Sequence, residues 1–147
     1  MYKRILAPLD GSSFSEGILE HVRAIALGCK VSEVILFRVL EPLPGYAGLG
    51  ENWHVEAEKK AGAWTVEYLA RKADELKKQG IKVKTAMGKG NAAEEILEYA
   101  SKNKVDLIIM ATHGSSGVVR WMLGSVADRV VRHASVPVLT VSPKGIK

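Results

Sequence analysis

The sequence predicts an α/β fold in which helices cover both faces of a parallel sheet. Its 147 residues match one domain, because domains of roughly 100–200 residues are the usual size. Short runs of continuously apolar residues recur along the chain, and such runs are typical of parallel strands buried on both faces. Stretches with helical periodicity separate the runs, which indicates a repeated alternation of strand and helix.

Five segments are predicted to form strands. Ile5–Ala7, Val34–Phe37 and Leu107–Ala111 are apolar throughout, so we expect them in the middle of the sheet. Ile81–Thr85 alternates between apolar and polar residues, which indicates that one of its faces meets water near a sheet edge. Val136–Val141 contains a proline that a central strand would not tolerate, so it is also predicted at an edge.

Four segments between the strands have the pattern of amphipathic helices. In the first, Ser13 and Glu16 have the spacing of a capping box. The second is the longest, and Trp64 is expected among the core residues on its apolar face. The helices are expected from Ser13 to Gly28, from about His54 to Gln79, after the N-cap Asn91, and from Ser125 onward.

This alternation implies right-handed crossovers and a doubly wound sheet, Rossmann-like or flavodoxin-like, in a single domain. With the two edge strands assigned above, strand order 3-2-1-4-5 is the simplest arrangement. Strands 1 and 4 then lie side by side while their crossovers leave toward opposite ends of the sheet. Ligands bind at such a switch point, in the crevice at the carboxyl ends of the strands. The irregular segment Glu41–Gly50 follows strand 2 and is placed to lie over this crevice.

Composition excludes several classes of protein. There are 21 Lys and Arg residues against 16 Asp and Glu, and the net charge of +5 is too mild and dispersed to indicate nucleic acid or a membrane as a partner. The longest apolar runs are far shorter than the ~18 residues of a transmembrane helix. Cys29 is the only cysteine, which excludes an intramolecular disulfide. We therefore expect a cytoplasmic protein without a signal peptide.

The residues that follow strands 1 and 4 predict a phosphate-binding site. Gly114 lets a ligand approach the backbone without a Cβ atom in the way, and Gly124 does the same where the loop returns. Ser125 opens a helix whose unsatisfied N–H groups and positive dipole end favour an anion. Asp10, across the crevice, is suited to accept hydrogen bonds from ribose hydroxyls or to help hold a metal beside a polyphosphate.

These residues belong to longer motifs. Residues 111–117 read Ala-Thr-His-Gly-Ser-Ser-Gly. Trp121–Val130 contains a Gly-Ser pair that is separated from Gly114 by nine residues. Together with Pro137-Val138-Leu139, these motifs resemble the universal stress protein family. Its ATP-binding branch carries Gly-x-x-Gly, nine residues, and then Gly-Ser or Gly-Thr. The resemblance extends to Ile5–Ser12, Leu36–Val39 and Gly90–Ile96, so that residues 1–147 are expected to form one nucleotide-binding domain.

The resemblance implies a role for each matching residue. The backbone of Val39 would hold adenine and Asp10 would hold the ribose. The glycines and the helix that begins at Ser125 would bind the phosphates of ATP, and Mg or Mn would be bound through those phosphates. The implied nucleotide-binding set is Pro8, Leu9, Asp10, Val39, Met110, Ala111, His113, Gly114, Gly124, Ser125 and Val126.

The chain departs from the family pattern at three positions. Ala111 replaces the first glycine of the Gly-x-x-Gly pair, so a methyl group stands near the expected ribose. Arg38 occupies a position where histidine is common. Ser115 occupies a position where Lys or Arg often follows the glycine, which removes a counter-charge for a phosphate.

Several of these residues also have a plainer interpretation. Gly114 and Gly124 are suited to turns, Asp10 to capping its own loop, and Ser125 to capping a helix. Their common location at the crevice favours a ligand site. His113 has the chemistry of a general base, but no second acid or nucleophile stands beside it, so a structural role is favoured.

A second glycine motif is also present. Residues 88–93 match the dinucleotide-binding fingerprint, following a strand and opening a helix. However, they follow an edge strand, and Thr112-His113 stand where the next strand would need an acidic residue for a ribose. We therefore expect a turn and a helix cap there.

The favoured function is an ATP-binding regulator or sensor in the stress response. Hydrolysis would need a group that orients water, and residues 114–125 contain no carboxylate, lysine or glutamine. Enzymatic activity is therefore not favoured, and slow adenosine-phosphate hydrolysis is one alternative. The other is a dimeric interaction module with a vestigial nucleotide site. The resemblance also implies a homodimer paired through Val136–Val141, an edge without charged residues, and a regulatory protein partner whose identity stays open.

Overall fold

The computed structural model describes residues 1–42, 50–114 and 122–143, and the side chains of these except at 50–54. Strands and helices alternate along the described chain. The strands are β1 (Arg4–Pro8), β2 (Glu33–Leu40), β3 (Val83–Lys89), β4 (Leu107–Ala111) and β5 (Val138–Val141). The helices are α1 (Ser13–Glu16), α2 (Leu19–Gly28), α3 (Gly50–Lys77), α4 (Ala92–Lys102) and α5 (Ser125–His133).

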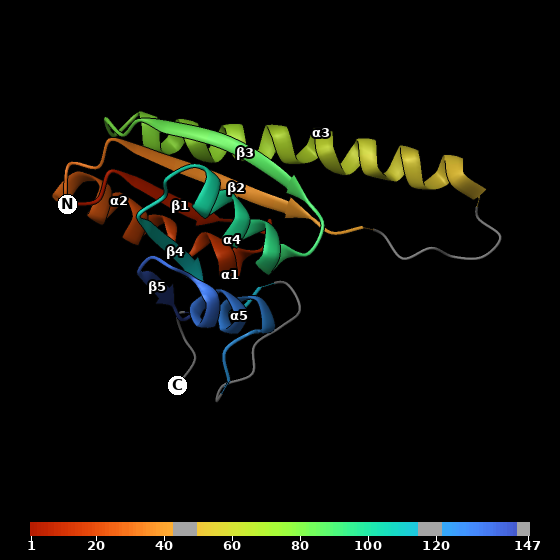
Figure 1. The fold of residues 1–147 in the computed structure, drawn as a ribbon. Helices are drawn as coiled ribbons and strands as arrows, with labels where there is room; N and C mark the ends of the chain where they lie inside the picture. The colour runs from red at the N-terminus through yellow and green to blue at the C-terminus, as the bar shows by residue number, and fades with distance from the viewer. Residues whose placement is uncertain (43–49, 115–121, 144–147) are drawn as a thin grey trace.

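The strands form one parallel sheet of order β3-β2-β1-β4-β5 (Figure 1), which confirms the predicted order. β1 pairs with β2 on one side and with β4 on the other, with Ile5 opposite Leu107. The chain therefore reverses its direction of winding between β1 and β4. This switch point brings the loops after β1 and β4 to the same edge of the sheet.

Two hydrophobic clusters, one on each face of the sheet, form the core. Ile5 and Ala7 of β1 pack with α2 and α3, whereas Leu6 packs with α4 and α5. The same alternation runs along β2 and β4, because successive side chains of a strand point to opposite faces. Both the odd-numbered and the even-numbered residues of the central strands are covered by helices, which explains why these strands are apolar throughout. The predicted helices on both faces of the sheet are confirmed.

The two edge strands differ in their bounds from the predicted segments. β3 begins at Val83 and continues to Lys89, because β2 offers partners as far as Leu40, which lies opposite Lys89. β5 begins at Val138, so Pro137 lies just before the strand. The carbonyl of Pro137 still accepts a hydrogen bond from the N–H of Ile108 at 3.0 Å. A proline in this place costs the ladder no donor.

The first predicted helix is divided into two. Ser12, not Ser13, is the N-cap of α1, and its hydroxyl oxygen accepts a hydrogen bond from the N–H of Ser15. Glu16 does not complete the predicted capping box, because its carboxylate accepts a hydrogen bond from the Tyr68 hydroxyl at 2.8 Å and pairs with Lys72 at 3.0 Å. Both partners belong to α3. The side chain that the sequence pattern assigned to a local cap therefore ties α1 to α3.

α3 is longer than predicted, since it begins at Gly50 rather than near His54, and it ends at Lys77. Figure 1 shows its amino-terminal half extending past the carboxyl ends of the strands. Most of the predicted segment Glu41–Gly50 lies outside the described residues. Neither α3 nor any other described helix combines the length and apolar character of a membrane span.

Trp64 of α3 is not a core residue, contrary to the prediction. Its side chain is 47% exposed, and the buried seam of the helix runs through Tyr68, Leu69 and Leu76 instead. Trp64 lies beside this seam and stacks on Tyr68, with ring centroids 4.9 Å apart and planes at 11°. Charged and apolar residues are interspersed along α3, so its sequence does not show which side of the apolar stripe packs against the sheet.

We expect Glu16→Gln to weaken the acid sensitivity of the fold. Burial raises the pKa of the Glu16 carboxyl, but hydrogen bonds from Lys72 and Tyr68, together with the positive charges of Lys72 and Arg71, outweigh burial and bring the pKa below the ordinary 4.5. A carboxyl with a lower pKa in the folded state stabilises the protein above the unfolded pKa, and this contribution is lost as the pH falls through the folded pKa. The variant should therefore lose about 1 kcal/mol or less at pH 7, and less at pH 3, in urea unfolding.

Glu75→Gln is the matched control for this measurement. Glu75 also pairs with Lys72, but at 3.8 Å and with a side chain that is 59% exposed. Its replacement should change the free energy of unfolding little at either pH. An equal loss at pH 7 and pH 3 for Glu16→Gln would mean that the ionised carboxylate is not what stabilises this contact.

Candidate functional site

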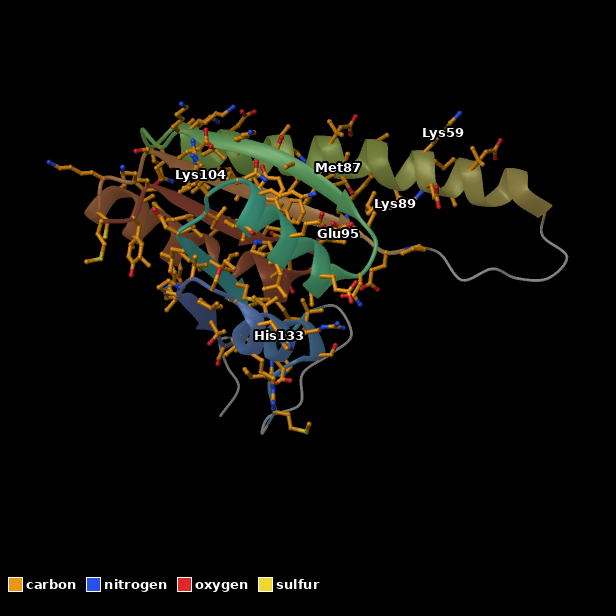
Figure 2. The ribbon with its side chains drawn as sticks, viewed as in Figure 1. Lys59, Met87, Lys89, Glu95, Lys104 and His133 are labelled. Atoms are coloured by element: carbon orange, nitrogen blue, oxygen red, sulfur yellow. The ribbon has the colours of Figure 1, made fainter. Side chains whose placement is uncertain are left out.

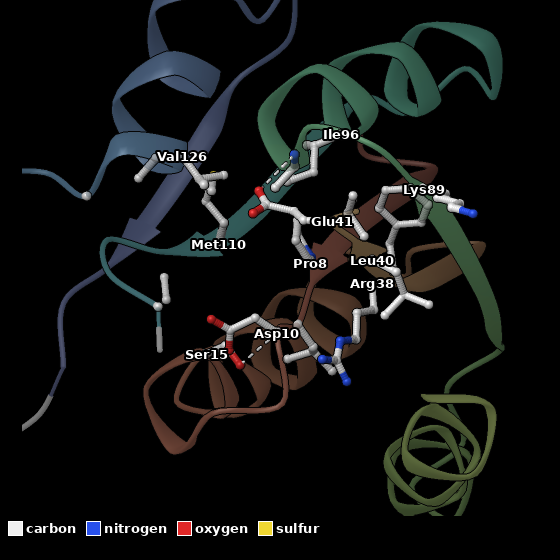
Figure 3. Close-up of a pocket in the computed structure, with 18 of the residues that line it drawn as sticks. Pro8, Asp10, Ser15, Arg38, Leu40, Glu41, Lys89, Ile96, Met110 and Val126 are labelled. Carbon is white, nitrogen blue, oxygen red and sulfur yellow. Dashed lines mark hydrogen bonds between the residues drawn. The ribbon is translucent and has the colours of Figure 1, made fainter. Parts of the chain in front are cut away.

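A cavity of about 840 Å³ opens at the switch point (Figure 3). Its walls come from the ends of β1, β2 and β4, the first turns of α4 and α5, and the projecting half of α3. Figure 3 shows Asp10, Met110 and Val126 around this space. Every residue of the predicted nucleotide-binding set lines the cavity: Pro8, Leu9, Asp10, Val39, Met110, Ala111, His113, Gly114, Gly124, Ser125 and Val126.

Asp10 is fixed by the turn that follows β1. Its Oδ1 accepts hydrogen bonds from the N–H of Ser12 at 2.9 Å and from the Ser12 hydroxyl at 2.5 Å. The N–H of Asp10 donates to the Ser15 hydroxyl oxygen at 3.2 Å. This is the loop-capping role that the sequence also allowed. It orients the carboxylate, which lines the cavity at the same time.

The loops after β1 and β4 touch each other at Gly114. A Cβ atom added to Gly114 would overlap Oδ2 of Asp10. A larger residue at this position would displace the Asp10 carboxylate, so the glycine is favoured by close approach rather than by an unusual backbone angle. The two halves of the site are therefore in van der Waals contact across the switch point.

Gly124 closes the loop that returns from β4. Its N–H donates to the carbonyl oxygen of Thr112 at 2.7 Å. An added Cβ would lie 2.7 Å from the same oxygen and 3.4 Å from Cα of His113. The Gly124 N–H is thus used inside the protein, and this glycine shapes the site rather than offering a donor to a ligand.

His113 fastens the same loop. Its Nε2 lies 2.6 Å from the carbonyl oxygen of Met122, and its Nδ1 lies 2.9 Å from the hydroxyl of Thr112. A carbonyl only accepts, so Nε2 carries the proton and Nδ1 accepts from the threonine in the neutral ring. Both ring nitrogens are engaged. The arrangement agrees with the structural role that was favoured over a general base.

The amino end of α5 faces the cavity, but Ser125 is not its cap. Gly124 occupies the N-cap position, where it has no side chain to contribute, and Ser125 is the first helical residue. The N–H of Asp128 makes the first intrahelical bond, to the carbonyl of Gly124 at 2.9 Å. The N–H groups of residues 125–127 precede that bond. They give this wall the donors and the positive dipole end that suit an anion.

One wall was not predicted. Arg38 lines the cavity, donates from Nη1 to the Thr65 hydroxyl at 3.1 Å, and lies over the ring of Trp64 with Cζ 5.0 Å from the centroid. Its Nε is buried without a hydrogen-bond partner in the described part of the chain. Lys89 also lines the cavity and pairs with Glu58 of α3 at 2.8 Å. Arg38 and Lys89 come from β2 and β3, and α3 supplies their partners Thr65, Trp64 and Glu58.

Residues 88–93 form the expected turn and cap. Gly88 and Lys89 are the last residues of β3 and pair with Val39 and Leu40 of β2. The Asn91 side chain accepts a hydrogen bond from the N–H of Glu94 at 3.1 Å and caps α4. The residues of this glycine motif therefore form the end of β3 and the start of α4.

The described residues do not gather a metal site. No group of three or more His, Cys, Asp or Glu side chains among them is placed to hold an ion. Asp10 is one of the carboxylates that line the cavity, and its Oδ1 is held by Ser12. A cation in this cavity would therefore need a ligand to supply most of its oxygens.

Comparison with known proteins agrees with this architecture. Residues 1–142 match the family model described as the universal stress protein family. The chain belongs to this family. Universal stress protein MJ0531 of Methanocaldococcus jannaschii is 37% identical over 144 residues, which cover 96% of this chain and 82% of that protein.

Solved structures extend the comparison to three dimensions. Universal stress protein MJ0577 of the same organism is 35% identical over 159 residues, covering 98% of this chain and 97% of the relative. Its structure matches with a TM-score of 0.88 at 34% identity and covers 99% of both chains. A universal stress protein in complex with cAMP matches with a TM-score of 0.72 at 22% identity, covering 96% of this chain and 97% of that one.

We expect Gly124→Ala to destabilise the fold. The added methyl meets a backbone oxygen that cannot withdraw, because the same oxygen accepts the Gly124 N–H. Overpacking of this kind costs about 1–3 kcal/mol in the free energy of unfolding, measured in urea. Gly62→Ala, in α3 with open space at its Cβ, should instead gain about 0.5–1 kcal/mol from helix propensity. A Gly124→Ala variant as stable as wild type would refute the tight loop closure.

Proposed function

We propose that this universal stress protein binds ATP in the switch-point cavity and acts as a nucleotide-dependent regulator or sensor in the cytoplasm. One observation carries the proposal: the Asp10 carboxylate and the amino end of α5 both line the same cavity. A nucleotide has hydroxyls for the first and phosphates for the second. The volume of about 840 Å³ lies within the range of roughly 300–1,000 Å³ typical of small-molecule sites.

The adenine is placed at the apolar end of the cavity. Met110 and Ile96 line that end and are each almost completely buried, and Val39 at the end of β2 supplies backbone groups for the purine edge. Apolar walls with a few fixed polar groups are what a base requires. The cAMP complex of a universal stress protein with the same fold supports the binding of a nucleotide.

The ribose and phosphates follow from the placement of the base. Asp10 accepts hydrogen bonds from the ribose hydroxyls, and the N–H groups of Ser125 and Val126 bind the phosphates with the dipole of α5 behind them. Mg or Mn is bound through the phosphates, since the described residues offer no metal cluster of their own. Arg38 connects the cavity to Trp64 and Thr65 of α3, so a bound nucleotide has a route to bias the position of that helix.

The described residues favour holding the nucleotide over cleaving it. Hydrolysis requires a group that orients or deprotonates water near the γ-phosphate. His113 has the right chemistry, but both of its nitrogens are engaged with Thr112 and Met122. We therefore propose a binding protein rather than an ATPase.

Binding can be tested together with the role of Asp10. Wild type should bind ATP in calorimetry about tenfold more tightly than 2′-deoxy-ATP, because a carboxylate left without its hydroxyl partner disfavours the analogue. In Asp10→Asn the side chain still accepts from the N–H of Ser12, so the turn is kept. The preference for the 2′-hydroxyl should then fall to about twofold, which measures the coupling directly.

Two results would count against this arrangement. If ATP does not bind to wild type at millimolar concentration, the nucleotide proposal is wrong. That result would favour the alternative, a dimeric interaction module with a vestigial nucleotide site. If ATP binds but the preference over 2′-deoxy-ATP is the same in wild type and Asp10→Asn, the ribose does not lie at Asp10. Gly114→Ala provides a further variant, because its methyl displaces the Asp10 carboxylate.

We also propose a homodimer that pairs through β5. This strand is at the end of the sheet, so one side of its backbone has no partner strand in the described chain. The last strand carries no charged residue that would oppose strand addition. Leu139 in its middle is 37% exposed. A two-fold antiparallel pairing would cover both the edge and this side chain.

Leu139→Lys should convert the dimer to a monomer in sedimentation equilibrium at micromolar concentration. The side chain is partly exposed in one chain, so the charge disturbs the pairing more than the fold. Leu27→Lys on α2, which is 49% exposed, is the matched control and should remain dimeric. A monomeric wild type, or dissociation of both variants alike, would contradict pairing through β5.

A further inference from the structure

A second, smaller cavity of about 320 Å³ lies at the opposite end of the sheet. It is formed where β1 and β2 begin, beside β3 and the end of α4. Figure 2 places Lys104, which lines it, far along the molecule from Lys59 and Lys89 of the switch-point cavity. The complete lining is Arg4, Glu33, Ile35, Lys84, Lys102, Asn103 and Lys104.

The charge of this lining is strongly unbalanced. Four of its side chains are cations and one is a carboxylate. That carboxylate, Glu33, is already shared between Arg4 at 3.9 Å and Lys82 at 4.0 Å. Lys102 pairs with Glu98 of the same helix. Lys84 and Lys104 make no ion pair within the described residues.

The cationic residues belong to elements that are held together by hydrogen bonds. Arg4 donates from Nη1 to the carbonyl oxygen of Asn103 at 3.3 Å, which joins β1 to the turn after α4. Asn103 in turn donates from its side chain to the carbonyl of Tyr99 at 3.0 Å. Lys84 stands in β3, which is hydrogen-bonded along its length to β2. Like charges held together in this way repel one another, and an anion between them relieves the repulsion.

The chemistry of the walls restricts what the anion can be. The apolar contribution to the lining is Ile35, whose side chain is 1% exposed, and the lining includes no aromatic ring. A nucleobase or a fatty chain would find little to contact here. Cations from three separate elements suit a compact group with several charged oxygens pointing in different directions.

We propose that this cavity binds a compact phosphate-bearing anion, with inorganic pyrophosphate as the model ligand. Lys84 and Lys104 supply the uncompensated charge, and Arg4 supplies a guanidinium fork. The site is independent of the nucleotide cavity, because it shares no lining residue with it. A cell would present the same chemistry as free pyrophosphate or as the phosphate group of a small metabolite.

Titration with pyrophosphate, followed by amide chemical shifts, locates the binding. The amide chemical shifts of Lys84, Asn103 and Lys104 should change on addition of pyrophosphate. These changes should be distinct from any at residues 125–127 of the switch-point cavity. The double variant Lys84→Gln/Lys104→Asn should lower the affinity at this cavity at least about tenfold, since each charged hydrogen bond lost is worth about a decade. Asparagine is chosen at position 104 because the backbone there has φ 54°, which asparagine tolerates.

Lys30→Asn/Lys78→Gln is the matched control. Lys30 has φ 53°, and neither residue lines the cavity, so the charge and backbone changes are the same while the site is intact. Affinity within about twofold of wild type is expected for the control, because distant exposed charges are screened by salt. Thermal unfolding without the anion shows that both variants fold.

Three outcomes would overturn the proposal. Shifts confined to residues 125–127 would place pyrophosphate in the nucleotide cavity instead. An equal loss of pyrophosphate affinity in the variant and in its control would show a general effect of charge rather than a specific site. Citrate bound at the same amides as tightly as pyrophosphate would show that the cavity selects charge and not phosphate. Inorganic phosphate and a phosphorylated sugar, tested in parallel, distinguish the two sources of the ligand.

Discussion

The site depends on the contact between Asp10 and Gly114. The two residues are more than a hundred positions apart in the sequence, and only the adjacency of β1 and β4 brings them together. A Cβ at Gly114 would overlap the Asp10 carboxylate, so the absence of a side chain at Gly114 allows the two loops to approach this closely. The closure at Gly124 and the His113 bonds then hold the second loop so that α5 begins at the cavity. The strand order therefore determines where the Asp10 carboxylate and the amino end of α5 lie.

Strand order and the site's membership could be predicted because they rest on strong local signals. Apolar runs without alternation require cover on both faces. The edge position of the last strand was predicted from Pro137, but Pro137 lies just before β5, so the position is right although that reason is not the one that sets it. Once the order is known, the ends of β1, β2 and β4 must meet, so residues as distant as Val39 and Ser125 fall on one cavity. The family resemblance selected among the residues at those ends.

The predictions that were wrong involve competition between local and tertiary partners. Glu16 fits a capping box in sequence, but a tyrosine and a lysine on α3 offer it stronger bonds. Ser125 fits an N-cap, but the tight return at Gly124 moves the cap one residue back. Trp64 fits a core position by periodicity, yet it covers Gly11 at the rim, where an added Cβ would lie 3.1 Å from its ring. A pattern within one helix contains no information about such neighbours.

The two proposed sites would attract anions by different physical means, and this difference determines what each would recognise. At the carboxyl ends of the strands, attraction comes from backbone N–H groups of α5, while Asp10 repels a bare anion that brings no hydroxyl group to it. Such a site discriminates, because a ligand needs an anionic part and a hydroxyl part at a fixed separation. At the amino ends, attraction comes from lysine and arginine side chains with little else in the lining. Binding of a phosphate group there would rest on side-chain charge, so a rise in ionic strength should weaken it more than binding at the switch-point cavity, where backbone dipoles do not depend on exposed side-chain charge.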